Sequence, residues 1–239
     1  MNSAQRKDYL AALGLQSWRL RRVAPPPALA AAPAAGIAAP APSVPELQVP
    51  ESPGDWEQLR ARVAACTRCE LSRTRTQTVF GTGSRQAQWL IVGEAPGAEE
   101  DRKGEPFVGR AGQLLNSMLR AIGLAREQVY IANVLKCRPP GNRDPSASEC
   151  ASCLPYLERQ IELLNPRIML AVGRIAAQNL LQVDAPLARL RQQEHRFGKS
   201  CVPLLVTYHP AYLLRSPADK RKAWEDLKLA REVCARVER

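Results

Sequence analysis

The sequence contains no run of about 18 consecutive apolar residues, which a membrane-spanning helix requires, although 45% of its 239 residues are hydrophobic. Its N-terminal segment is charged and has no apolar stretch that ends at a small-residue cleavage site, so the pattern of a secretory signal is missing. We therefore expect a globular, cytoplasmic protein that does not associate with a membrane.

Three common glycine-rich motifs are also missing where the chain most invites them, in the turn "GEAPG" after the apolar run 90–92. A phosphate-binding P-loop would place a lysine and then Ser or Thr after its glycines, and a dinucleotide-binding turn would read G-x-G-x-x-G. The nucleophile elbow of an α/β-hydrolase would carry a Ser where this chain has Ala95. The turn presents the carboxylate of Glu94 instead.

Seven cysteines are present, but a disulfide framework is not expected in a cytosolic protein, where cysteines more often bind metals or pack in cores. Cys66 and Cys69 form one C-x-x-C unit, Cys150 and Cys153 form another, and Cys137 lies between them. Spacing alone would pair the two units as a zinc site. Cys201 and Cys234 are expected to be ordinary thiols.

Acidic residues are outnumbered, with 23 Asp and Glu against 34 Lys and Arg and a formal net charge of +11. Most of this excess lies in residues 54–239 and not in a basic tail. A strongly basic folded region favours a polyanionic partner, and nucleic acid is the first expectation.

Composition divides the chain into three parts. Residues 1–22 are predicted to form an amphipathic docking peptide, with Asp8 as its cap and Trp18 on its apolar side. Residues 23–54 are rich in alanine and proline, cannot build a core, and are predicted to form a disordered linker. Residues 55–239 are predicted to form the single folded domain.

Strand and helix patterns alternate through this domain. Apolar runs predict strands, and periodic or capped segments predict helices. The expected strands are 88–92, 129–135, 167–173 and 202–210, and the expected helices are 55–65, 111–122, 146–164, 174–182 and 217–238. Continuous apolar strands that alternate with helices favour a three-layer α/β/α fold around a central, mainly parallel four-stranded sheet.

Ligands of such sheets bind at the carboxyl ends of the strands. The residues there include Glu94, Asn133 and His209, and the loop after the first strand carries Phe107. An aromatic ring can stack on a planar base, and an asparagine amide can match the ring N–H and carbonyl of uracil. A donor from His209 can reach the other carbonyl. Together these groups predict a pocket for a base taken out of its stack.

Four motifs, "VGEAPG", "GEPFVGRAGQLL", "IANVLKCRPPGNRDP" and "TYHPAYLLR", follow "CTRCELS" in order. In this order and spacing they resemble the family 4 uracil-DNA glycosylases, the bacterial and archaeal type with an iron–sulfur cluster. The resemblance covers about residues 56–238. It implies hydrolysis of the bond between uracil and deoxyribose, which leaves an abasic site and begins base excision repair.

The resemblance also implies roles for individual residues. His209 would donate to the uracil O2, and Glu94 would orient water or stabilise the cationic sugar; in the wider superfamily the water-activating aspartate stands where this chain has Ala95. The implied residues are Glu94, Ala95, Phe107, Asn133 and His209 for uracil, Arg138, Arg143, Arg174 and Arg215 for DNA phosphates, and Cys66, Cys69, Cys137 and Cys153 for a [4Fe–4S] cluster. Glu100 is a weaker candidate for excluding the methyl group of thymine.

Residues 1–22 are similar to the N-terminal peptide of the psi subunit of the bacterial clamp loader, which docks on the chi subunit. The shared arrangement here runs from Leu13-Gly14 to Arg21-Arg22 through Trp18. The resemblance implies chi as a partner, and a basic arm that touches DNA is the alternative. We expect the protein to be a monomer.

Two other functions are consistent with parts of the sequence. A non-enzymatic nucleic-acid-binding module built on four metal-bound cysteines would explain the charge and the cysteines, but not the convergence of Phe107, Asn133 and His209. A related glycosylase of broader base specificity would explain all of these features.

Overall fold

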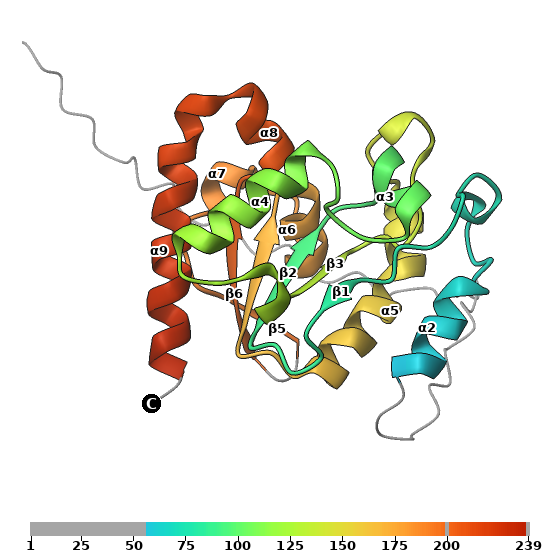
Figure 1. The fold of residues 1–239 in the computed structure, drawn as a ribbon, viewed down its shortest axis with the longest axis horizontal. Helices are drawn as coiled ribbons and strands as arrows, with labels where there is room; N and C mark the ends of the chain where they lie inside the picture. Colours follow the sequence, from blue (N-terminus) through green and yellow to red (C-terminus); the bar gives the residue numbers. More distant parts are fainter. Residues whose placement is uncertain (1–55, 199–200, 238–239) are drawn as a thin grey trace, which may run out of the picture. The chain divides into compact units, whose positions relative to one another are not determined.

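The computed structural model describes residues 56–198 and 201–237. The predicted docking peptide and linker lie outside these residues. The described part contains a six-stranded sheet with the strand order β1-β3-β2-β4-β6-β5 (Figure 1). The strands are β1 (Thr82–Gly83), β2 (Trp89–Gly93), β3 (Tyr130–Asn133), β4 (Ile168–Val172), β5 (His195–Phe197) and β6 (Val202–Thr207).

Helices connect and cover these strands. They are α2 (Trp56–Ala64), α3 (Ala98–Lys103), α4 (Arg110–Ala121), α5 (Ala147–Leu164), α6 (Arg174–Leu181), α7 (Leu187–Leu190), α8 (Pro210–Arg215) and α9 (Lys220–Val237). The closing helix was predicted from residue 217, but residues Pro217–Asp219 form a separate 3-10 turn before α9 begins. The segment after β2, predicted as a long loop, contains α3.

The four predicted strands form the parallel centre of the sheet, where β3, β2, β4 and β6 pair in that order. The expectation of only four strands was incomplete, because two short antiparallel strands, β1 and β5, close the edges. His195 belongs to β5, and its Nε2 is 2.8 Å from the Leu190 carbonyl oxygen.

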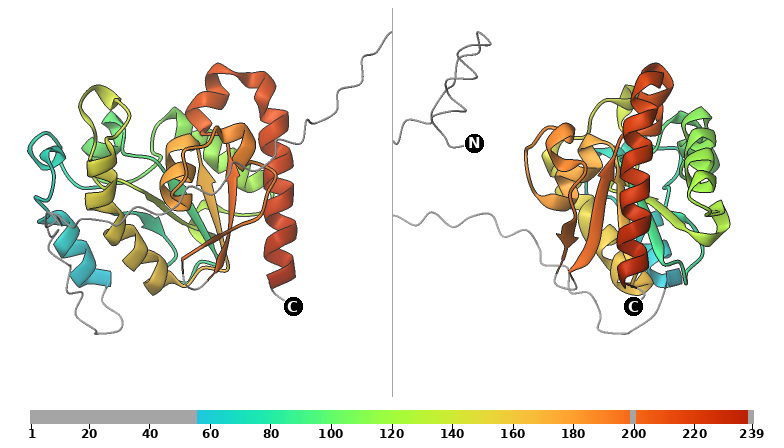
Figure 2. Two further views of the ribbon diagram at one scale, coloured as in Figure 1. Left: turned by 180° about the vertical axis from the view of Figure 1, so that it is seen from behind. Right: turned by 90° about the vertical axis from the view of Figure 1, so that its left-hand side faces the viewer.

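Each face of the sheet is buried under helices, so the fold has three layers (Figure 2). Leu90 and Val92 point into one core, which also contains side chains of α5 and α6. Ile91 alternates with them and packs in the other core, with side chains of α4 and α9. The period-two alternation of a strand thus serves two cores.

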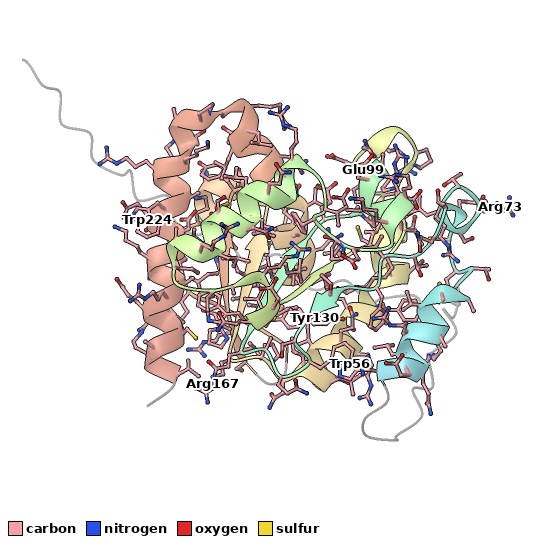
Figure 3. The ribbon with its side chains drawn as sticks, viewed as in Figure 1. Trp56, Arg73, Glu99, Tyr130, Arg167 and Trp224 are labelled. Carbon is pink, nitrogen blue, oxygen red and sulfur yellow. The ribbon has the colours of Figure 1, made fainter. Side chains whose placement is uncertain are left out.

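A local sequence signal sets the start of α5. Ser146 caps α5 by accepting a hydrogen bond from the Glu149 N–H, and the Glu149 carboxylate accepts from the Ser146 N–H in return. These two reciprocal hydrogen bonds form a capping box. An aromatic contact places α2: Trp56 of this helix packs against Tyr130 of β3 with ring centroids 5.1 Å apart (Figure 3). This contact holds α2, and with it the cysteine loop that follows, against the sheet.

Within the described residues, no helix is long and apolar enough to cross a membrane.

Candidate active site

The carboxyl edge of the sheet carries an open cleft of about 420 Å³. Gly93, the last residue of β2, lies opposite Asn133, the last residue of β3, in the parallel register. Loops that follow β2, β3 and β6 complete the walls. Of the predicted site residues, the cleft is lined by Glu94, Ala95, Phe107, Asn133, Arg143, His209 and Arg215. The structure therefore brings the three predicted base-binding side chains and the predicted acid together.

Asn133 lies at the floor of the cleft with 2% of its surface exposed, and its Oδ1 has no hydrogen-bond partner. Buried polar atoms are nearly always hydrogen-bonded, because an unpaired one loses its water without compensation. An orphaned carboxamide oxygen that faces a cleft is suited to a ligand that brings an N–H group.

Phe107 forms one wall, and its backbone adopts a left-handed conformation with a φ of 54°. Such a conformation is strained for a bulky residue and persists only when the surroundings impose it. Three contacts do so. The Arg126 guanidinium donates to the Pro106 carbonyl at 2.6 Å, and Glu100 Oε1 accepts from the N–H groups of Val108 and Gly109 at 3.0 and 3.2 Å.

Glycines make room for this wall. A Cβ on Gly112 of α4 would lie 1.7 Å from the Phe107 carbonyl oxygen. A Cβ on Gly93 would lie 2.4 Å from Asn133 Oδ1 and 2.7 Å from Phe107 Cζ. Gly93 is therefore required because a side chain there would fill the space between the ring and the amide.

His209 is the N-cap of α8, and the centroid of its ring lies 5.7 Å from that of Phe107. Its Nδ1 accepts a hydrogen bond from the Ala211 N–H at 3.1 Å, which assigns the proton of the neutral ring to Nε2. Burial, with a smaller contribution from Arg215, lowers the pKa of His209 to about 4. The ring is therefore neutral near pH 7 and offers an Nε2–H donor.

Glu94 follows Gly93 directly at the mouth of the cleft. Burial raises the pKa of its carboxyl to about 7, and the nearby Asp144 carboxylate adds to this rise, while Arg174 opposes it. Arg174 in turn donates to Asp144 at 2.8 Å. Glu94 is thus poised to change its charge near neutral pH, as general acids and bases do.

The four arginines predicted to contact DNA differ in their surroundings. Arg143 forms two hydrogen bonds with Glu149, at 2.7 and 2.9 Å, and Arg174 is paired with Asp144. Arg138 Nε donates to Asn142 Oδ1 at 2.8 Å. Arg215 is exposed, lines the cleft, and forms no ion pair within the described parts of the chain.

Four of the cysteines line a second, smaller cavity, and they are the predicted set: Cys66, Cys69, Cys137 and Cys153. Cys150 is not among its lining residues. Within residues 56–198 and 201–237, no three metal-binding side chains converge closely enough for a single ion. A [4Fe–4S] cluster binds each thiolate through a different iron, so its four cysteines surround a cavity and do not meet at a point.

The surroundings of this cavity suit anionic sulfur. Arg75 Nη1 donates to Cys137 Sγ at 3.0 Å, and the Lys136 N–H donates to Cys153 Sγ at 3.2 Å. Burial alone opposes this charge, because it raises the pKa of Cys153 to about 12 and also raises that of Cys137. A coordinating metal deprotonates such thiols outright, so the residues present fit an iron–sulfur cluster.

Sequence reasoning missed three features of these sites. Asp144, which raises the pKa of Glu94, was not singled out, although it stands in the "NRDP" sequence of the loop that follows β3. Arg126, which holds Pro106, comes from a segment with no motif. Lys136 stands within the motif "IANVLKCRPPGNRDP", and nothing in the sequence signals that it is buried.

Fold and site together define a class: an α/β protein with an aromatic ring, an amide and a neutral histidine gathered in a cleft at the carboxyl edge of a parallel sheet, groups suited to a flat, polar heterocycle. Residues 80–228 match the model of the uracil DNA glycosylase superfamily, and the chain belongs to this superfamily. The chain is 44% identical over 181 residues to a type-4 uracil-DNA glycosylase of Archaeoglobus fulgidus, covering 73% of this chain and 90% of the relative.

Other relatives show the same kinship. A type-4 uracil-DNA glycosylase of Thermotoga maritima is 42% identical, over 73% of this chain and 92% of the relative. A type-5 uracil-DNA glycosylase of Pyrobaculum aerophilum is 30% identical, over 67% of this chain and 84% of the relative.

Proposed function

We propose that this chain is a type-4 uracil-DNA glycosylase, which hydrolyses the N-glycosidic bond of uracil flipped out of DNA and leaves an abasic site. The observation that carries the proposal is the orphaned, buried Oδ1 of Asn133, placed in one cleft with Phe107 and His209. Higher identity to type-4 than to type-5 relatives, and the cavity with four cysteines, support the type.

Uracil recognition is assigned to the floor and wall of the cleft. Asn133 Oδ1 accepts from the uracil N3–H, and its amide group donates to the neighbouring carbonyl. Cytosine presents a bare ring nitrogen and an amino group at these positions, so both contacts fail. Phe107 stacks on the base, and the main-chain N–H groups of the turn at Glu94 and Ala95 bind a carbonyl oxygen.

Bond cleavage leaves negative charge on uracil and positive charge on the sugar. The neutral His209 donates its Nε2–H to the uracil O2 as charge develops there, which is electrostatic stabilisation and not nucleophilic attack. Glu94, when ionised, stabilises the cationic sugar and orients the water that attacks it. Where the wider superfamily has a water-activating aspartate, this chain has Ala95. The neighbouring Glu94 therefore supplies the carboxylate for this role.

The four thiolates of Cys66, Cys69, Cys137 and Cys153 would hold a [4Fe–4S] cluster. The reaction contains no redox step, so the cluster's contribution is structural. The four cysteines lie in the loop after α2, in the loop after β3 and in α5, so a bound cluster would tie the loop that carries Arg138 and Asn142 to the rest of the fold.

The first experiment is a cleavage assay on oligonucleotides that contain a single uracil, in single and double strands, with thymine, hypoxanthine and cytosine in parallel. Release of uracil alone supports the proposal. Release of hypoxanthine or mismatched thymine at similar rates would favour the glycosylase of broader specificity, and DNA binding without base release would favour the non-enzymatic module.

Cofactor identity is tested on the same preparation. Iron and sulfide content with a brown colour supports the cluster, whereas a colourless protein that holds zinc overturns it. Cys153→Ser is expected to abolish cluster binding and Cys150→Ser to leave it intact, because only Cys153 lines the cavity. The reverse result would reassign the fourth ligand.

The similarity of residues 1–22 to the chi-binding peptide supports a second, separable proposal: that this peptide carries the enzyme to the clamp loader's chi subunit. Full-length protein should be retained by immobilised chi, and Trp18→Ala should abolish retention. Equal retention of both proteins, or of neither at micromolar concentration, would remove chi as the partner.

A further inference from the structure

Lys136 is among the largest side chains that are fully buried, with 1% of its surface exposed. It stands between the last residue of β3 and the cluster ligand Cys137. Lysine is almost never buried without a partner, because its charge is costly to remove from water. The mechanism proposed above gives this residue no task.

The contacts of Lys136 join the two sites of the protein. Its Nζ donates to the main-chain carbonyl of Asn133 at 2.8 Å and to Gln160 Oε1 at 2.6 Å. Its own N–H donates to Cys153 Sγ at 3.2 Å, and the residue is among those that line the cysteine cavity. One residue therefore contacts both the base-reading strand end and the proposed cluster site.

Neither of the two Nζ acceptors is charged, and Lys136 forms no ion pair with a carboxylate in the part of the chain that the structure describes. Gln160 is itself held in place, since its Nε2 donates to the Phe80 carbonyl at 2.9 Å. Two groups that can carry negative charge adjoin Lys136: Cys137 follows it in the chain, and Cys153 accepts from its main-chain N–H. A buried charge requires such a counter-charge.

We propose that Lys136 is a positioning residue that couples the cluster site to base recognition. Its ammonium group is the counter-ion of the metal-bound thiolates, and through its bond to the Asn133 carbonyl it fixes the residue that reads uracil. The inference rests on the proposed cluster and uracil pocket. It would explain why an enzyme without a redox step contains a cluster. Without the thiolates, Lys136 would be an uncompensated buried charge in contact with the Asn133 carbonyl.

A purely structural role makes a different prediction. If Lys136 only filled space, methionine, which is similar in length and apolar, would replace it at no cost to iron binding or to uracil affinity. The test therefore compares Lys136→Met with Lys136→Arg, which keeps the charge, and with Gln160→Leu, which removes one Nζ acceptor without touching the cysteine cavity. Lys228→Met, at an exposed lysine of α9, controls for the change in net charge.

Three quantities are measured on anaerobically reconstituted protein: the rate of iron loss to a chelator, inhibition by free uracil per iron-loaded molecule, and affinity for undamaged DNA. Lys136→Met is expected to lose iron about ten- to hundredfold faster than the wild type, the effect typical of a residue that supports metal ligands. Its inhibition by free uracil should weaken by a similar factor. Its affinity for undamaged DNA should match that of Lys228→Met. Lys136→Arg should retain iron, and Gln160→Leu should weaken uracil inhibition with its iron intact.

Wild-type iron retention or wild-type uracil inhibition in loaded Lys136→Met overturns the proposal. If Lys136→Met does not fold, the proposal stands only if Lys136→Arg loads iron and Gln160→Leu weakens uracil inhibition. Absence of uracil release from DNA by the wild type would defeat the proposed function instead, and the iron-loss rates would still decide whether Lys136 supports the cluster.

Discussion

His209 Nδ1 accepts a hydrogen bond from the main-chain N–H of Ala211 at 3.1 Å. This single contact fixes the tautomer of the ring, because the nitrogen that accepts cannot carry the proton. The other nitrogen, Nε2, is left as a donor toward the cleft. Pro210, which has no N–H, lies between the two residues and starts α8.

His209→Ala should therefore lower kcat for uracil release by about 10²–10³, the typical cost of removing one donor to a developing oxyanion. The measurement is single-turnover cleavage of a uracil-containing duplex. Alanine also removes the ring nitrogen that accepts from the Ala211 N–H, so thermal unfolding should shift by an amount typical of a lost helix cap, about 1 kcal/mol. A loss of less than a few-fold in kcat would show that His209 does not face the leaving group.

The pH profile should be governed by Glu94 and not by His209. Because the pKa of Glu94 is raised to about 7 and only its ionised form stabilises the cationic sugar, kcat/KM should rise with pH through this range. His209, with a pKa of about 4, stays neutral and contributes no limb above pH 5. Glu94→Gln should flatten the profile.

The neighbours of Glu94 should move this limb in opposite directions. Asp144→Asn removes a negative charge and releases Arg174, and both changes favour the ionised carboxylate, so the limb should move to lower pH. Arg174→Gln removes the opposing cation and should move the limb to higher pH. Unchanged profiles in both variants would show that another group titrates.

Gly93→Ala should block uracil while leaving DNA binding unchanged. The added Cβ would lie 2.4 Å from Asn133 Oδ1, so the amide and the Phe107 ring must move apart. Misplacement of about 1 Å typically costs 10²-fold in rate. The matched control is Gly109→Ala, whose Cβ would meet only Glu100 Oε1 at 3.7 Å. Equal activity of the two variants would contradict the proposed base position.

Phosphate contacts should be visible in the salt dependence of DNA affinity. Arg215→Ala should reduce the slope of log K against log [salt] by about one, the contribution of one neutralised phosphate. Arg174→Ala should leave the slope unchanged, because Arg174 is already paired with Asp144. Titrations at four or more salt concentrations measure both slopes, and an unaltered slope in Arg215→Ala would remove it from the DNA footprint.

The sequence by itself determined the centre of the sheet and most of the helices around it. In a strand, a continuous apolar run such as residues 90–92 is buried completely only when both faces of the sheet are covered. The capping pair Ser146 and Glu149 determines a helix start by local hydrogen bonds. The edge strands β1 and β5 were not predicted, because segments of two or three residues with mixed burial show no periodic pattern. They are strands only because they pair with the neighbouring strands β3 and β6.

The sequence also determined which chemical groups stand at the strand ends, since parallel strands bring their carboxyl ends to one edge. Only the tertiary structure decided how these groups act. The left-handed turn at Phe107, the pKa of Glu94 and the burial of Lys136 depend on residues distant in the chain, namely Arg126, Asp144 and Gln160. Burial and charge interactions depend on distance in space, and local patterns do not record them.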